Sequence, residues 1–82
     1  MRSRRLIVGN ISHSVTNEQL KKLFSYYGGV KRVSIIEGRG FGFVEMSSPS
    51  EAEIAKEELN GYEFKGLALR VDEARPRKKD IP

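Results

Sequence analysis

Apolar residues recur along the chain at spacings that predict the order strand, helix, strand, strand, helix, strand. The strands alternate apolar and polar positions with a period of two, as expected when one face of a sheet is buried. They cover residues 6–10, 30–36, 39–46 and 67–72. A small hairpin over residues 62–66 precedes the last strand. In that strand Leu69 and Val71 are predicted to point inward, so Ala68 and Arg70 point to the opposite face.

Capping signals place the start of both helices. Residues 16–19, Thr-Asn-Glu-Gln, have the spacing of a capping box, and Val15 and Leu20 are placed as a hydrophobic staple. Residues 48–51 repeat the capping-box pattern with proline at the first helical position. The helices end at glycines 28–29 and at residues 60–61. The residues expected on their core-facing sides are Leu20, Leu23, Phe24, Tyr27, Ala52, Ala55 and Leu59, with Ile54 half exposed.

This order of elements predicts a ferredoxin-like α+β sandwich. In a βαββαβ chain, right-handed crossovers place both helices on one face of a four-stranded antiparallel sheet. A tight turn at Glu37-Gly38 is expected to join the second and third strands. The other face of the sheet is left open. The side chains expected on it are Ile7, Arg32, Arg39, Phe41, Phe43 and Arg70, with Arg5 at its margin.

The most informative segment is residues 39–46, Arg-Gly-Phe-Gly-Phe-Val-Glu-Met. Strand alternation puts Phe41 and Phe43 side by side on the open face, where each ring can carry one unpaired base. Gly40 and Gly42 are predicted to fall on the other face. Glycine in a strand is tolerated mainly where another group comes close, and close packing of a helix would be one reason for these two.

Residues 39–46 resemble the longer signature of the RNA-recognition motif family, Lys/Arg-Gly-Phe/Tyr-Gly/Ala-Phe-Val-x-Phe/Tyr. Only Met46 departs from it, at a core-facing position where methionine is an adaptable filler. Residues 6–11 resemble the shorter signature of the same family. There the family usually has an aromatic residue at the position of Ile7, so this chain is expected to bind fewer bases or to bind them more weakly. The likeness is to small single-domain cyanobacterial RNA-binding proteins and glycine-rich plant relatives.

The resemblance implies a single-stranded RNA-binding module in which sheet-face aromatics stack bases and basic residues contact phosphates. The residues it implies for RNA binding are Arg5, Ile7, Asn10, Arg32, Arg39, Phe41, Phe43, Arg70, Arg75 and Arg77. Single-stranded DNA is an alternative ligand, and a protein-interaction module of the same fold is the alternative function. Some protein-binding members carry Arg-x-Phe after the second helix, whereas this chain has Tyr62-Glu63-Phe64 there.

The distribution of charge favours a polyanionic partner. The 82 residues carry a net charge of +4 at pH 7. Residues 1–5 and 75–82 together carry +6, while residues 6–74 carry −2. We therefore expect a basic N-terminal arm, a single folded domain and a basic C-terminal tail over these three ranges. Four glutamates between residues 51 and 58 are expected on a solvated helix surface.

Chemistry beyond binding has little support in the sequence. The chain has no cysteine, so disulfides and thiolate metal sites are excluded, and His13 has no second ligand nearby. Acylphosphatases share the architecture, but residues 9–13 supply no comparable phosphate-binding loop. We expect no catalytic residue, no metal and no cofactor, and neither a small-molecule substrate nor a membrane as partner. The protein is expected to be an intracellular monomer, in the cytoplasm or, in a eukaryote, in the nucleus.

Overall fold

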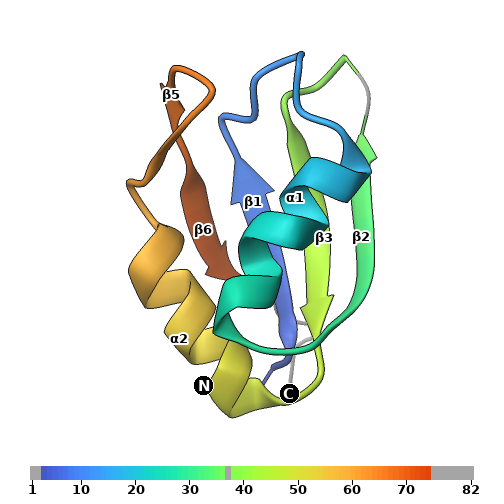
Figure 1. Cartoon of the computed structure of the whole chain (residues 1–82), viewed down its shortest axis with the longest axis vertical. Coiled ribbons are helices and arrows are strands. Elements are labelled where there is room, and N and C mark those ends of the chain that lie inside the picture. Colours follow the sequence, from blue (N-terminus) through green and yellow to red (C-terminus); the bar gives the residue numbers. More distant parts are fainter. Residues whose placement is uncertain (1–2, 37, 75–82) are drawn as a thin grey trace, which may run out of the picture.

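The computed structural model describes residues 3–36 and 38–74, and their elements follow the predicted order (Figure 1). They are β1 (Arg5–Gly9), α1 (Asn17–Phe24), the 3-10 helix η1 (Ser25–Tyr27), β2 (Val30–Ile36), β3 (Phe41–Met46), α2 (Pro49–Leu59), β4 (Glu63–Phe64), β5 (Leu67–Ala68) and β6 (Arg70–Glu73).

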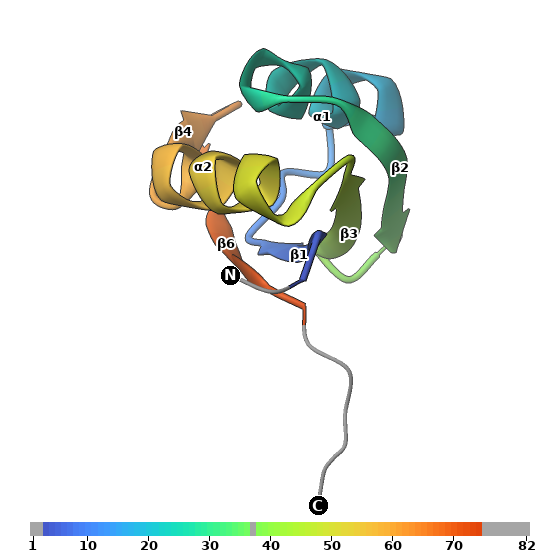
Figure 2. The ribbon, with the colours of Figure 1, turned by 90° about the horizontal axis from the view of Figure 1, so that it is seen from below.

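Four of the strands form one antiparallel sheet in the order β2-β3-β1-β6. Figure 2 shows α1 and α2 together on one side of this sheet. The strands β4 and β5 pair in a separate hairpin. The predicted ferredoxin-like α+β sandwich is therefore confirmed, and within the described residues the second face of the sheet is not covered by a helix.

Local sequence signals set the start of α1. The Thr16 hydroxyl accepts a hydrogen bond from the Gln19 amide at 3.1 Å, and Gln19 Oε1 accepts one from the Thr16 amide at 3.1 Å. The predicted capping box is thus complete. The residues that pack toward the sheet from α1 and η1 are those predicted, buried or partly buried: Leu20, Leu23, Phe24 and Tyr27.

The start of α2 follows the prediction only in part. Ser48 caps the helix by accepting a hydrogen bond from the Glu51 amide at 3.3 Å, and Pro49 is the first helical residue. The Glu51 side chain, however, turns toward Gly28, where an added Cβ would lie 2.6 Å from Glu51 Cβ. Glu51 Oε1 is buried without a hydrogen-bond partner among the described residues. Glu51 therefore completes no second capping box and does not belong to the solvated acidic surface.

The boundary between the second and third strands differs from the prediction. β3 begins at Phe41, so Arg39 lies in the turn and not on the strand. Gly38 and Gly40 have φ values of 78° and 72°, and the Arg39 amide donates a 3.2 Å hydrogen bond to the Ile36 carbonyl. Because Ile36 pairs with Phe41, the connection occupies residues 37–40 and is longer than the expected two-residue turn.

Two other strand limits also differ. β1 runs from Arg5 to Gly9, and Asn10 leaves it in the left-handed region with a φ of 58°. The predicted strand over residues 67–72 is interrupted, because Leu67–Ala68 pairs with β4 while Arg70–Glu73 pairs with β1. The inward direction of Leu69 and Val71 is confirmed, since both are buried.

Position 42 must be glycine because the backbone of a neighbouring strand, and not a helix, lies close to it. A Cβ added at Gly42 would lie 2.6 Å from the Ser34 carbonyl oxygen and 2.8 Å from Ile35 Cα, both in the backbone of β2. Distances this short leave no room for a side chain. The expectation that a helix packs closely over this glycine is therefore wrong.

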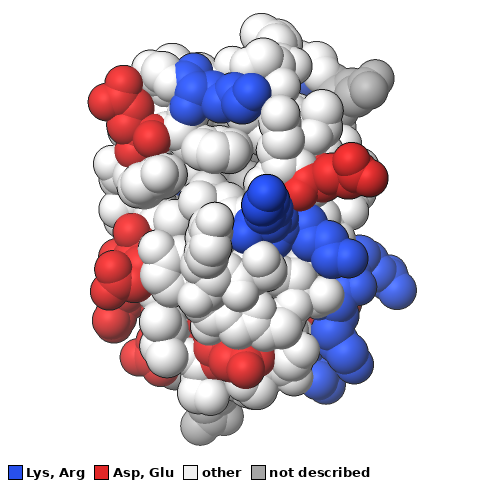
Figure 3. All heavy atoms as spheres, viewed as in Figure 1, with Lys and Arg blue, Asp and Glu red and all other residues white. Residues whose placement is uncertain are grey.

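The helix-covered face carries charges of both signs. Figure 3 shows Asp and Glu along the side of α2, and Lys and Arg over α1 and toward β2. This face is separate from the open face of the sheet, which lies behind it in the same view. In the part of the chain that the structure describes, no helix is long and apolar enough to cross a membrane.

Candidate nucleic-acid interface

Strand register arranges the open face of the sheet in three rows. The loop-side row runs across the sheet through Ile36, Phe41, Gly9 and Arg70. The central row runs through Ser34, Phe43, Ile7 and Asp72. The terminal row contains Arg32, Glu45 and Arg5. The residues between these positions along the strands, such as Leu6, Val8 and Val44, are fully buried on the helix side.

The two phenylalanines meet edge to face at the centre of this surface. The ring centroids of Phe41 and Phe43 are 6.0 Å apart, and the ring planes are inclined by 84°. Two nearly perpendicular rings cannot both lie parallel to the sheet. In this conformation one ring can therefore stack under a base that lies flat on the sheet, while the other presents its edge or stands beside the base.

An arginine accompanies the Phe43 ring. The guanidinium carbon of Arg5 lies 5.7 Å from the ring centroid, within the range of a cation–π contact. Arg5 is exposed. Glu45 of β3 pairs with Arg5 of β1 on one side and with Arg32 of β2 on the other. The guanidinium of Arg5 lies over the ring, so a nucleotide that stacks on Phe43 would meet this cation.

The structure brings most of the predicted residues together. The members found on the open face are Arg5, Ile7, Arg32, Phe41, Phe43 and Arg70. Arg39 and Asn10 lie at the loop end of this face, where they line a hollow of about 680 Å³ together with Arg70 and His13. Arg75 and Arg77 lie outside the described residues.

Asn10 has a structural contact of its own. Its Nδ2 donates a 2.8 Å hydrogen bond to the Ala68 carbonyl, which ties the end of β1 to β5. Its left-handed backbone is one that asparagine tolerates better than most residues. This bond uses one of the two amide N–H groups of Asn10, so the other N–H and the side-chain oxygen are the groups left for a ligand.

Sequence reasoning missed Asp72 as a member of the open face. Its side chain is 78% exposed, and Lys56 Nζ lies 3.9 Å from its Oδ1. The signal was present, because Arg70 and Asp72 alternate with the buried Val71. The open face therefore carries the acids Glu45 and Asp72 beside its arginines, and its charge is mixed.

The comparison with known families settles the membership of the chain. The sequence model of the family described as RNA recognition motif matches residues 6–70. The chain belongs to the RNA recognition motif family. The match spans both signature segments of this RNA recognition motif, from the second residue of β1 through β2 and β3 to the first residue of β6.

Similar proteins include cyanobacterial and plant ones. The protein RbpE of Nostoc sp. is 45% identical over 80 residues, which cover 90% of this chain and 81% of RbpE. The chloroplast 29 kDa ribonucleoprotein of Arabidopsis thaliana is 44% identical over 81 residues, which cover 92% of this chain but 24% of the plant protein. The family resemblance read from the sequence is confirmed.

Solved structures of RNA recognition motifs superpose closely. The crystal structure of RNA binding protein PG1 has a TM-score of 0.85 at 40% identity and covers 94% of this chain and 100% of that chain. A Sex-lethal protein in complex with RNA has a TM-score of 0.87 at 26% identity, covering 94% of this chain and 50% of that chain.

Proposed function

We propose that this protein binds single-stranded RNA on the open face of its sheet. The observation that carries the proposal is the pair Phe41 and Phe43, two large rings left only partly buried at the centre of a surface bordered by arginines. Membership of the RNA recognition motif family supports it, as does the likeness to a protein solved in complex with RNA.

Each residue has a chemical role in this proposal. Phe43 stacks a base, Phe41 packs beside it against a second base or a sugar, and Ile7 offers apolar contact. Asn10 supplies hydrogen-bonding groups at the loop end. The cations that meet phosphates or base edges are Arg5, Arg32, Arg39, Arg70, Arg75 and Arg77. Each base stacked on an aromatic ring is worth about 1–3 kcal/mol by alanine substitution, so the two rings dominate short-range affinity.

The further parts of the proposal concern the setting of the domain. We place the folded domain at residues 6–74, with a basic arm at residues 1–5 and a basic tail at residues 75–82. The protein acts as a monomeric, non-enzymatic binding module inside the cell, in the cytoplasm. Single-stranded DNA is the alternative ligand. Contacts to the 2′-hydroxyl groups, which only RNA has, would make the protein bind RNA more tightly than DNA.

Removal of the rings tests the proposal. In the variant Phe41→Ala/Phe43→Ala we expect affinity for a labelled short RNA to fall by about 2 kcal/mol or more, roughly 30-fold, because the stacking contact of Phe43 and the packing contact of Phe41 are both lost. Fluorescence anisotropy gives the dissociation constant, and an amide NMR spectrum verifies that the fold persists.

The matched control removes an aromatic ring from the helix side. Tyr26 is 73% exposed in η1, so Tyr26→Ala removes a ring of similar size without touching the open face. RNA affinity of this control should stay at the wild-type value. Unchanged RNA binding by the folded double variant would mean that the sheet face is not the binding surface.

A further inference from the structure

The open face is recessed beside β6. Ile7 and Gly9, which lack the bulk of the neighbouring rings, line the recess together with Phe41. Arg70, Val71 and Asp72 form the β6 wall, Lys56 and Asn60 from the end of α2 complete the lining, and the hollow has a volume of about 490 Å³. Sites for small ligands typically occupy roughly 300–1,000 Å³, so the hollow is large enough to take a nucleobase.

The β6 wall offers complementary groups at a fixed spacing. Arg70 and Asp72 flank the buried Val71, so both side chains leave β6 on the open face, roughly 6.5–7 Å apart along the strand. Arg70 presents a fork of N–H donors, and the carboxylate of Asp72 only accepts hydrogen bonds. A base in the hollow would meet two N–H donors from Arg70 and two acceptor oxygens from Asp72.

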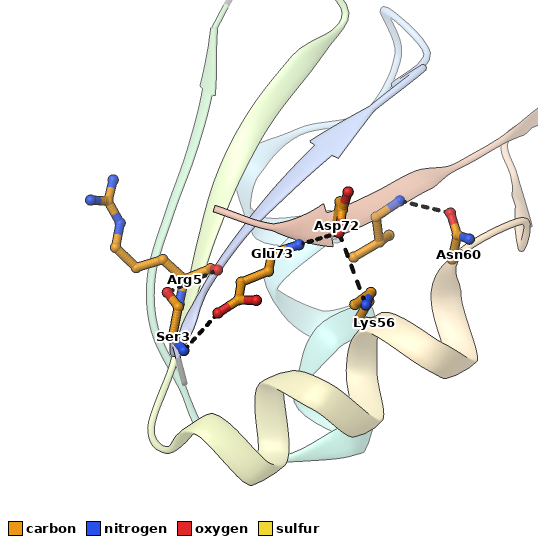
Figure 4. A network of polar contacts seen from close by, with 7 residues as sticks. Ser3, Arg5, Lys56, Asn60, Asp72 and Glu73 are labelled. Atoms are coloured by element: carbon orange, nitrogen blue, oxygen red, sulfur yellow. Dashed lines mark hydrogen bonds and ion pairs between the residues drawn. The ribbon is translucent and has the colours of Figure 1, made fainter. Parts of the chain in front are cut away.

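Lys56 and Asn60 from the end of α2, which also line the hollow, hold this wall in place, as Figure 4 shows. Asn60 Oδ1 accepts a 3.0 Å hydrogen bond from the Val71 amide, which fixes the backbone between Arg70 and Asp72. Lys56 Nζ lies 3.9 Å from Asp72 Oδ1, and the same oxygen accepts a 2.7 Å hydrogen bond from the Glu73 amide. Both contacts fall on Oδ1, which orients the carboxylate, and a carboxylate oxygen such as Oδ2 can accept hydrogen bonds from a ligand.

Among the four RNA bases, guanine matches this pair of side chains. Its N1–H and N2–H₂ groups are adjacent donors that suit a carboxylate, and its O6 and N7 are adjacent acceptors that suit an arginine. Adenine and cytosine each place a ring-nitrogen acceptor next to their amino group, and uracil has one N–H between two carbonyls. Each of these would bring a lone pair against the carboxylate of Asp72.

We propose that the hollow beside Ile7 is a guanine-selective site, in which Asp72 accepts hydrogen bonds from N1–H and N2–H₂ and Arg70 donates to O6 and N7. The base rests on Ile7 and Gly9 beside Phe41. Lys56 and Asn60 are positioning residues. This inference rests on the proposed RNA-binding function and adds a base preference to it.

The test uses five pentanucleotide RNAs that differ at the central position. Anisotropy titrations compare UUGUU with UUAUU, UUCUU, UUUUU and an inosine probe, which lacks only the 2-amino group of guanine. We expect UUGUU to bind about fivefold or more tightly than the other natural sequences, the low end of the discrimination by one bidentate contact. The inosine probe should fall between guanine and uracil.

The diagnostic variant is Asp72→Asn. It keeps the size of the side chain but replaces one acceptor by a donor, so the preference for guanine should shrink to within about twofold. Affinity for UUUUU should stay the same or rise, since a negative charge is lost. Glu45→Gln is the matched control, because it removes one acid from the terminal row of the same face and should leave the preference intact.

The outcomes separate the two proposals. Binding that is lost in Phe41→Ala/Phe43→Ala but is equal for all probes would overturn the guanine site and leave the RNA-binding function standing. A guanine preference that survives Asp72→Asn would likewise overturn the guanine site and leave the RNA-binding function standing. Failure of every probe to bind would overturn the RNA-binding function itself. Binding that ignores the loss of both rings would overturn the sheet face as the binding surface, and the guanine site with it.

Discussion

At Gly42 the backbone of one strand comes closer to its neighbour than any side chain would allow. The Ser34 carbonyl oxygen and Ile35 Cα occupy the space where a Cβ would be. This glycine lies between Phe41 and Phe43, so the close approach of β2 and β3 also fixes the backbone that carries both rings. The spacing of the aromatic pair thus depends on a residue that has no side chain.

Gly42→Ala is expected to destabilise the fold by about 1–3 kcal/mol, because the added methyl group must push the β2 backbone away. Urea unfolding followed by circular dichroism measures the change. Gly9→Ala is the control, since its Cβ would lie 3.8 Å from Arg70 Cβ at ordinary contact distance. Equal losses of stability in the two variants would contradict this account of Gly42.

Much of the residue-level picture follows from alternation in the sequence. The inward direction of Leu69 and Val71 and the outward direction of Ile7, Phe41 and Phe43 depend only on the pleat of a strand. The angle of 84° between the two rings was beyond such reasoning, because side-chain torsions depend on packing with neighbouring strands.

At the scale of elements, each helix supplies an asparagine to one outer strand of the sheet. Asn17, the first residue of α1, accepts a 3.1 Å hydrogen bond from the Ile35 amide in β2. Asn60, at the end of α2, accepts one from the Val71 amide in β6. Because β2 and β6 are the two edges of the sheet, these bonds occupy backbone groups that could otherwise pair with another chain.

Asn60→Ala is expected to cost roughly 1 kcal/mol and to speed hydrogen exchange at the Val71 amide, since that donor loses its acceptor. Amide exchange followed by NMR gives the rate at this single site. Asn60→Asp keeps an acceptor oxygen and should retain slow exchange. A Val71 amide that exchanges at the wild-type rate in Asn60→Ala would show that the side chain does not protect this edge.

The order and type of the elements were predictable, but some of their limits were not. Capping and periodicity located α1 and α2, whose signals lie within a few residues of one another. The position of Arg39 in a turn depends on the positive φ values of Gly38 and Gly40, which glycine permits but does not demand. The contact between Lys56 and Asp72 joins residues distant in sequence and needed the three-dimensional structure.

At the scale of the whole molecule, the proposed binding mode assigns short-range and long-range attraction to RNA to different parts of the chain. The rings Phe41 and Phe43 lie on the sheet, whose face also holds two acids. All of the excess positive charge belongs to residues 1–5 and 75–82, which together carry +6 against −2 in the rest of the chain. Stacking on the rings is insensitive to salt, whereas contacts between basic residues and phosphates weaken as salt rises.

Removal of residues 75–82 is expected to weaken binding to all RNA sequences alike and to reduce its salt dependence. Four basic residues are lost, so the slope of log affinity against log salt should become shallower by up to about 3. Anisotropy titrations at several salt concentrations measure the slope. The double variant Phe41→Ala/Phe43→Ala should bind more weakly with the slope unchanged; a truncated chain with the full slope would contradict a role for the tail.

The two ends of the described chain are fastened to each other. The Ser3 hydroxyl donates a 3.1 Å hydrogen bond to the Ala74 carbonyl, and the Ser3 amide donates one of 2.9 Å to Glu73 Oε2. The polypeptide therefore enters and leaves the domain at a single point. Such a domain can be inserted into a surface loop of a host protein without separating the two ends of that loop. A short linker between residues 3 and 74 would also allow a circular permutant with new termini at another surface loop.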